Sequence, residues 1–244
     1  MAMTWRQLIN AALTTAGSAQ IPAAQATITD PYMLQVAEFS NQVYEDVWSA
    51  CQWRALWTVY NIAYAQNVVT QQIVDAVTAA SPNSNCSVVR MMNPQAGRPV
   101  ALCFDTTSVG VPFPLTESPI ADLIYMNTIT AVMAVAYSTN FAVVDQGNDI
   151  VNLMVYPASA TARTIQITLY NPPVRWDPAT SDLDTAILIP YKPILMATIW
   201  RIFEERGEEL GANSQYTEAG YREALDDAVS RDTGDAGGLV LLVD

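Results

Sequence analysis

The sequence predicts an α+β fold, with a helical bundle formed by N- and C-terminal helices and an inserted, mainly antiparallel β domain. Apolar residues recur at helical spacing in residues 1–57 and 186–232, whereas residues 58–185 are rich in β-branched, aromatic and turn-forming residues. Neither helical segment covers its own apolar stripe, so the two are expected to pack together as one helical body. The remaining residues, 233–244, are predicted to form an extended C-terminal arm.

Two helices are expected near the N-terminus. Thr4 and Gln7 have the spacing of a capping box, and apolar residues then recur at helical spacing. Residues 19–31 read as a connector, at whose end Asp30 and Pro31 predict the start of a longer helix, because Asp caps helices and Pro is tolerated at the first helical position. The apolar stripe of this second helix consists of Met33, Val36, Ala37, Phe39, Val43, Tyr44, Val47, Trp48 and Cys51.

Strands are expected through the middle of the chain. Residues 164–170 alternate apolar and polar side chains, which is typical of a strand with one buried face. Only a short connection separates them from the strand at 151–156, so these two strands are predicted to pair as a hairpin. The other predicted strands are 58–65, 68–77, 87–92, 99–104, 123–135 and 139–144. Residues 105–120, which contain prolines, are predicted to form a long outward-reaching loop.

Residues 123–144 carry no formal charge, which raises the question of a membrane span. Polar residues interrupt this stretch, however, and a helical span requires about 20 predominantly apolar residues. No signal peptide is expected either, because Arg6 is followed by an amphipathic stretch that is not continuously apolar. The sequence therefore predicts a chain without a membrane segment.

Two further helices are expected between residues 182 and 232, joined by a Gly/Asn turn. The first is predicted to start near Lys192 with Pro193 in its opening turn, and Asn213 or Ser214 is predicted to cap the second. The buried face of the first helix is expected to comprise Leu195, Ile199, Ile202 and Phe203, flanked by Ile194, Thr198 and Arg201. Oppositely charged residues four positions apart in the second helix are typical of a solvated face.

The composition indicates self-association and argues against tight binding of nucleic acid. Hydrophobic residues make up 51% of the chain and charged residues 14%, compared with about 25% charged residues in an ordinary globular protein. So few charges predict that part of the surface is covered by other copies or partners. The net charge is −13 and Lys192 is the only lysine, so tight wrapping on DNA is not expected. An acidic wall suits a passage through which DNA slides.

The sequence provides little basis for catalysis. A chain without histidine cannot form a Ser-His-Asp or Cys-His arrangement, and no phosphate-binding glycine loop is present. Cys51, Cys86 and Cys103 lack metal-ligand spacing and are expected to be buried thiols. Asp182 and Asp184 resemble an acidic pair but are expected to punctuate the loop before a helix. We therefore expect no enzyme activity, no cofactor and no metal.

Several stretches together resemble a known family. These are CQWRALW at 51–57, NLMVYPASATARTIQITLYNPP at 152–173 and SDLDTAILIPYKPILMATIWRIFEERGE at 181–208, in this order of elements. They resemble the head-to-tail adaptor of short-tailed bacteriophages, of the tail tubular protein A type. The resemblance implies a homo-oligomeric ring of twelve subunits in the virion, beneath the portal protein and above the tail nozzle. DNA would pass through its channel without sequence-specific binding, and the protein would be made in the host cytoplasm.

The C-terminal arm is the candidate partner-binding segment. A Gly-Gly hinge precedes five apolar, β-prone residues, a composition that can add to a partner's sheet edge or fill an apolar groove. The residues are Gly237, Gly238, Leu239, Val240, Leu241, Leu242 and Val243. The resemblance implies that this arm engages the portal, while an arm that frays or folds back on its own subunit is the alternative.

Two other functions compete with the adaptor. A capsid decoration or receptor-binding fibre-type protein would also be an acidic structural protein, and an acidic-site hydrolase would use paired carboxylates such as those at 204–209. Ring symmetry separates the first alternative from the adaptor, because fibres are commonly trimeric. The loop at 105–120 is the candidate for contact between rings.

Overall fold

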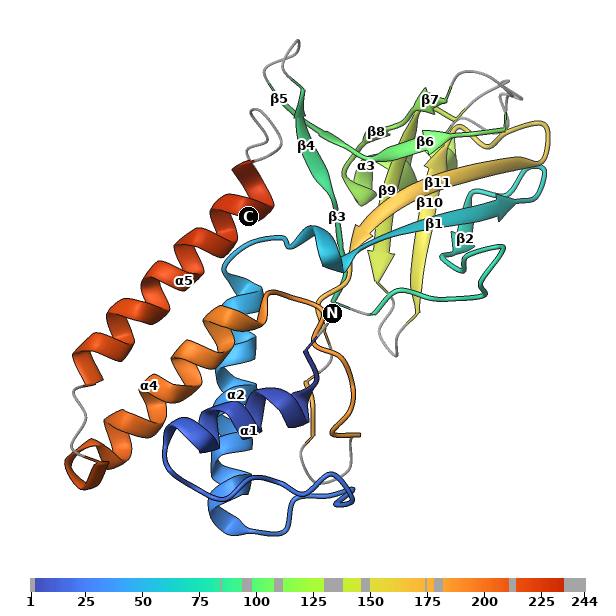
Figure 1. Ribbon diagram of the computed structural model, residues 1–244. Coiled ribbons are helices and arrows are strands. Elements are labelled where there is room, and N and C mark those ends of the chain that lie inside the picture. The colour runs from blue at the N-terminus through green and yellow to red at the C-terminus, as the bar shows by residue number, and fades with distance from the viewer. Residues whose placement is uncertain are drawn as a thin grey trace. The chain divides into compact units, whose positions relative to one another are not determined.

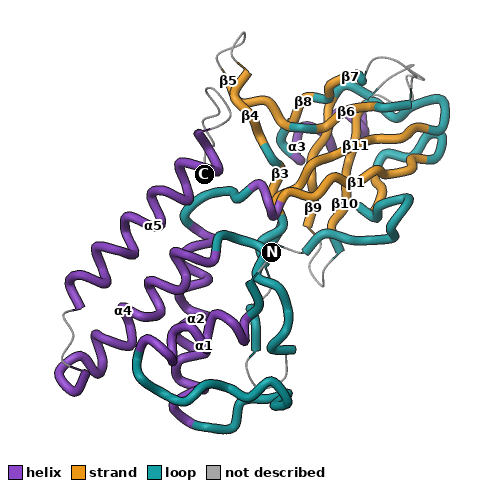
Figure 2. The backbone as a smooth tube through the Cα atoms, viewed as in Figure 1, coloured by secondary structure: helices purple, strands orange, loops and turns teal. Residues whose placement is uncertain are grey.

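The computed structural model describes residues 3–83, 85–93, 98–107, 112–129, 138–145, 150–173, 175–177, 182–210 and 214–234. Helices and mainly antiparallel sheets make it an α+β structure, which confirms the predicted class (Figure 1). The described residues form two compact units. The helical unit runs to Ala55 and resumes at Pro173, and the β unit comprises Leu56–Pro172 (Figure 2).

Both N-terminal helices begin where the sequence predicts. Thr4 and Gln7 form the capping box, since the Thr4 hydroxyl accepts a hydrogen bond from the Gln7 amide and the Gln7 side chain accepts one from the Thr4 amide. Asp30 caps the second helix by accepting hydrogen bonds from the amides of the second and third helical residues. The helices of this unit are α1 (Trp5–Thr15), α2 (Pro31–Ser49), α4 (Tyr191–Leu210) and α5 (Ser214–Gly234), and a 3₁₀ turn spans Arg54–Leu56.

Helix α4 is central to the helical unit and packs against α1, α2 and α5. Its most buried side chains include Ile194, Thr198 and Ile202, whereas Leu195 and Phe203 are half-buried. Ile199 and Ile202 are thus buried as predicted, while the buried face is shifted from Leu195 and Phe203 toward the flanking Ile194 and Thr198. A helix that contacts neighbours on several sides has no single apolar stripe. The polar Thr198 can be buried in this unit because its hydroxyl donates a hydrogen bond to the Ile194 carbonyl oxygen at 2.8 Å.

Helices α4 and α5 lie side by side (Figure 1). The rings of Trp200 and Tyr221 stack between them with centroids 6.1 Å apart. A Cβ atom at Gly220 would lie 2.8 Å from Met196 Cε, so the end of the Met196 side chain packs where a larger residue would place its Cβ atom. Helix α5 ends at Gly234 and thus includes the first two residues of the predicted arm.

The segment before α4 fastens the start of α1. The Trp5 amide donates to the Thr185 carbonyl oxygen at 3.2 Å, and Thr4 forms an isolated antiparallel bridge with Ala186. Trp176 stacks on Trp5 with ring centroids 4.7 Å apart and an interplanar angle of 10°. The hydrogen bond to Thr185 satisfies the Trp5 amide, which lies in the first helical turn and has no partner within α1.

The β unit contains two larger sheets and a two-stranded ribbon. The strand order is β1-β11-β6-β7 in the first sheet, with β3 also pairing β11, and β2-β10-β9-β8 in the second; β4 pairs with β5. Only the β8–β9 pair is parallel among the described ladders. The strands are β1 (Trp57–Tyr64), β2 (Thr70–Gln72), β3 (Ser87–Val88), β4 (Arg90–Asn93), β5 (Arg98–Ala101), β6 (Cys103–Asp105), β7 (Phe113–Pro114), β8 (Thr116–Glu117), β9 (Asn140–Asp145), β10 (Val151–Tyr156) and β11 (Arg163–Tyr170).

The predicted hairpin of residues 151–156 and 164–170 is wrong. Strand β10 pairs with β2 and β9, whereas β11 pairs with β1 along eight residues of each strand. The connection after β10 therefore passes from one sheet to the other. Both sheets supply the same apolar core, and the Tyr64 hydroxyl in β1 donates to the Leu153 carbonyl oxygen in β10.

The predicted strand at 123–135 is also wrong where the structure describes it. Residues Ile120–Ile129 form helix α3, which packs against β9 and β10. Strand β9 already pairs with β8 and β10, so neither of its edges is free for another strand. The predicted strand at 68–77 is reduced to Thr70–Gln72. Within the described residues, the structure has no helix with the length and apolar character of a membrane span.

Candidate partner-binding site

The predicted partner-binding residues, Gly237 to Val243, lie outside the described residues. The structure does describe the helix from which they extend. Helix α5 is described through Gly234, and its C-terminal half lies beside the first turn of α4. The surroundings of the arm's origin can therefore be built from described side chains.

A cavity of about 380 Å³ opens beside the end of α5. Its apolar wall combines the proline and tyrosine side chains at the start of α4 with two alanines of α5. The lining residues are Pro190, Tyr191, Lys192, Pro193, Ala224, Asp227, Ala228, Arg231 and Asp232. An apolar wall with a few charged groups is typical of a pocket for a small ligand or side chain.

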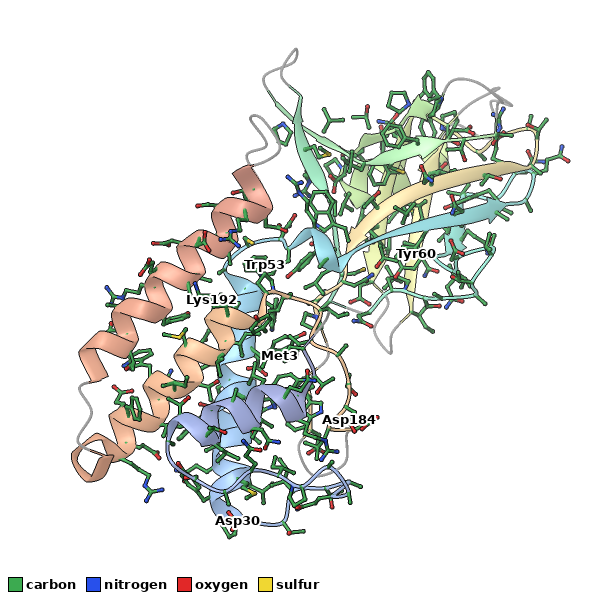
Figure 3. All side chains as sticks on the ribbon, in the orientation of Figure 1. Met3, Asp30, Trp53, Tyr60, Asp184 and Lys192 are labelled. Carbon is green, nitrogen blue, oxygen red and sulfur yellow. The ribbon has the colours of Figure 1, made fainter. Side chains whose placement is uncertain are left out.

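Some of the charged side chains around this cavity form an ion pair or a hydrogen bond within the chain, and Lys192 is exposed. Arg231 and Asp227 form an ion pair across one helical turn at 2.9 Å. Asp232 accepts a hydrogen bond from the Arg54 amide at 3.1 Å, which joins α5 to the turn after α2. Lys192 is exposed at the first turn of α4, where the helix dipole adds positive potential (Figure 3). The cavity can accept an apolar side chain with a carboxylate nearby.

The acidic pair before α4 has a structural role. Asp184 binds the Arg6 guanidinium at 2.8 Å, and the hydrogen bond from Arg6 holds the pKa of Asp184 below its usual range. Asp182 accepts a hydrogen bond from the Asp184 amide at 2.9 Å, as expected for a residue that punctuates a loop. Both carboxylates are thus engaged in fastening this loop, and no group of three or more metal-ligating side chains occurs in the described part of the chain.

The cysteines are poorly suited to nucleophilic chemistry. Cys51 and Cys103 are buried and Cys86 is half-buried. Burial raises the pKa of Cys51 to about 12 and that of Cys86 to about 11, and it raises the pKa of Cys103 as well. These groups remain thiols at neutral pH.

Most of the arginines whose side chains are described are neutralised within the chain. The pairs are Arg6–Asp184, Arg90–Glu117, Arg163–Asp105, Arg175–Glu38, Arg222–Glu218 and Arg231–Asp227. The Arg163–Asp105 pair is almost fully buried, with 9% and 3% of the side chains exposed. With a net charge of −13 and these cations occupied, the part of the chain that the structure describes offers little basic surface to a phosphate backbone.

The predicted loop at 105–120 contains ordered elements. Asp105 lies in β6, and β7, β8 and the start of α3 follow; residues 108–111 lie outside the described residues. Phe113 is exposed in β7, and Ile120, Ile124 and Tyr125 are exposed on α3. Ile124 and Tyr125 were predicted to lie in a strand and Phe113 and Ile120 in a loop, although Pro119 directly before an apolar run is a signal for a helix start.

Comparison with known proteins adds no family. No protein-family model matches this chain, and comparison with curated proteins finds no match.

Proposed function

We propose that this chain is a structural virion protein: a ring-forming head-to-tail adaptor that joins the portal to the tail and lines the DNA channel. In this proposal a helical body and an inserted β domain build each subunit, and subunits of a ring, twelve in the family that the sequence resembles, contact their neighbours through different faces. The arm from Gly237 to Val243 fastens the ring to the portal.

The observation that carries the proposal is the distribution of charged and apolar groups. The chain has a net charge of −13, and most arginines with described side chains are already paired with carboxylates of the same chain. Such a surface repels DNA and suits a channel wall along which DNA moves without adhering. At the same time, large apolar side chains are exposed, chiefly in the β unit, as expected for a subunit that contacts copies of itself.

Truncation after Ala236 tests the role of the arm. We expect it to abolish binding to capsids that carry the portal but lack this chain, because the apolar segment is removed. The circular dichroism spectrum and melting temperature should be retained, since the removed residues follow α5. A full-length variant with Leu241→Ser and Leu242→Ser is the matched control for chain length and should also fail to bind. Unchanged binding of both variants contradicts the assignment of the arm.

Negative-stain images of the purified protein, alone and on capsids, test the ring itself. An open annulus supports the adaptor. Trimeric spikes on the capsid surface would instead support a decoration or fibre protein.

A further inference from the structure

Helix α3 exposes an unusual apolar surface. Only Asp122 among its ten residues is charged. Leu123 is fully buried, but 52% of Ile124 and 66% of Tyr125 are exposed. A helix with so few charges is normally enclosed by protein on all sides.

The outward side of α3 can be read from its periodicity. Leu123 and the half-buried Met126 and Asn127 define the inward side, which faces β9 and β10. At about 100° per residue, the opposite side carries Ala121, Ile124, Tyr125 and Thr128, all of them exposed. We call these four residues the α3 outward face. None of them is charged.

One of the two hydroxyl groups on this face is already bonded within the helix. Thr128 donates its hydroxyl proton to the Ile124 carbonyl oxygen of the same helix at 2.7 Å, so its donor is already used. The face is also held in place, since α3 packs against the second sheet through Leu123. A fixed, uncharged helix face is a preformed surface for a partner.

The charge of the chain indicates which partner fits. A basic partner would gain attraction on acidic parts of the surface and would gain none on the α3 outward face. Another copy of this chain also carries a net charge of −13 and meets the least repulsion where acidic groups are sparse; on α3 the exposed Asp122 beside the face is the one carboxylate. An uncharged apolar face satisfies that requirement.

We propose that the α3 outward face is a contact surface between adjacent copies of this chain, docking on a different surface of the next copy. The β unit offers other exposed apolar side chains for the opposite half of such a contact, namely Val59, Val77, Phe113 and Ile150. Contact between unlike surfaces allows identical subunits to close a ring. The inference rests on the proposed ring and names the surface through which that ring forms.

The test compares charged substitutions on and off this face. A double variant, Ile124→Glu and Tyr125→Glu, places two carboxylates on the α3 outward face. Leu188→Glu is the matched control, because Leu188 is 60% exposed but belongs to the helical unit. Tyr125→Ser is a milder second variant that removes apolar area without adding charge. Sedimentation velocity at rising protein concentration measures assembly, and circular dichroism confirms folding.

We expect wild type and Leu188→Glu to assemble, and the double variant to self-associate at least about tenfold more weakly, as expected when a central contact is lost. Tyr125→Ser should weaken assembly to a smaller extent while keeping the wild-type melting temperature. Full assembly of the folded double variant overturns the inference while leaving the ring intact. Wild-type protein that stays monomeric both alone and on portal-bearing capsids overturns the proposed ring.

Flotation with phosphatidylcholine vesicles tests the other possible partner of the α3 outward face, which is a lipid surface. Wild-type protein that floats with vesicles, and a double variant that does not, would assign the face to a lipid surface and overturn the inference. Absence of flotation together with loss of assembly in the double variant supports contact between copies.

Discussion

Asp75 holds the turn that follows β2. Its carboxylate accepts hydrogen bonds from the amides of Asn61 at 2.9 Å, Val77 at 3.0 Å and Thr78 at 2.7 Å. These bonds, those from the Asn61 and Thr78 amides foremost, hold the pKa of Asp75 well below its usual range. The turn is closed by Ala79, whose φ of 57° lies in the left-handed region and whose amide donates to the Asp75 carbonyl oxygen.

Replacement of Asp75 by Asn should flatten the dependence of stability on pH in the acid range. A carboxyl group whose pKa is lower in the folded than in the unfolded chain stabilises the fold above its unfolded pKa, about 3.9, and loses that contribution as pH falls toward the folded pKa. The melting temperature of wild type should therefore decrease more steeply than that of Asp75→Asn below about pH 4. Thermal melts at successive pH values measure this, and parallel curves would contradict it.

The sequence contained a signal for this turn that the strand prediction at 68–77 did not use. An Asp with a Thr three residues later is typical of a side-chain-capped turn, and Asp75 and Thr78 have this spacing. The β-branched residues around them favoured a strand instead. The hydrogen bond from the Asn61 amide in β1 to the Asp75 carboxylate depends on the folded chain and could not be predicted locally.

At the scale of elements, α2 offers the clearest test of a locally encoded helix start. Asp30 accepts hydrogen bonds from the amides of Tyr32 at 2.9 Å and Met33 at 3.0 Å. Asp30→Ala should lower the free energy of unfolding by about 0.5–2 kcal/mol, because two amides lose their partner and the helix dipole loses a compensating charge. Denaturant unfolding measures the change.

The matched control for that experiment is Asp30→Asn, which keeps the capping oxygen. It should recover most of the stability lost in Asp30→Ala. Equal stability of wild type and Asp30→Ala would show that packing of α2, and not its cap, determines where this helix begins.

Local signals explain why the helix starts were predicted and the strand pairing was not. The capping box at Thr4 and the Asp30-Pro31 pair act within a few residues and are readable in sequence. Strands β1 and β11 pair although they are far apart in the sequence. Trp57, for example, lies opposite Tyr170. Chain proximity favoured β10 as the neighbour of β11, and the core shared by the two sheets excludes that arrangement.

Helix α3 shows a second limit of periodicity. Its apolar and β-branched residues are compatible with a buried strand or with a helix that has apolar residues on both sides. An exposed helix is normally recognised in the sequence by its polar face. A helix whose outward face contacts another molecule lacks that polar face. The error thus falls on the surface that we propose as the contact between copies.

At the scale of the whole molecule, charge should control assembly through ionic strength. Copies that each carry a net charge of −13 repel one another, while contact through an uncharged face gains nothing from opposite charges. Raising the salt concentration from about 0.01 M to about 0.1 M shortens the screening length from about 30 Å to about 10 Å, so self-association should become tighter.

Sedimentation velocity across this range of salt measures the effect. Tyr125→Ser is a useful companion, because its assembly should remain weaker than that of wild type at every salt concentration. Dissociation of wild type by added salt would mean that opposite charges hold the copies together and would contradict an uncharged contact.

The fastening of α1 by the loop before α4 has a consequence during protein synthesis. Thr4 pairs with Ala186, and the Trp5 amide donates to Thr185, so the first helix emerges from the ribosome about 180 residues before its partners. At about 5–20 residues per second, this loop follows the first helix by on the order of 10–40 s, and during that time Tyr44 of α2 is an aromatic neighbour that Trp5 can already contact. The Trp176 ring that stacks on Trp5 arrives only with that later segment, so the aromatic cluster at the start of α1 is completed near the end of synthesis.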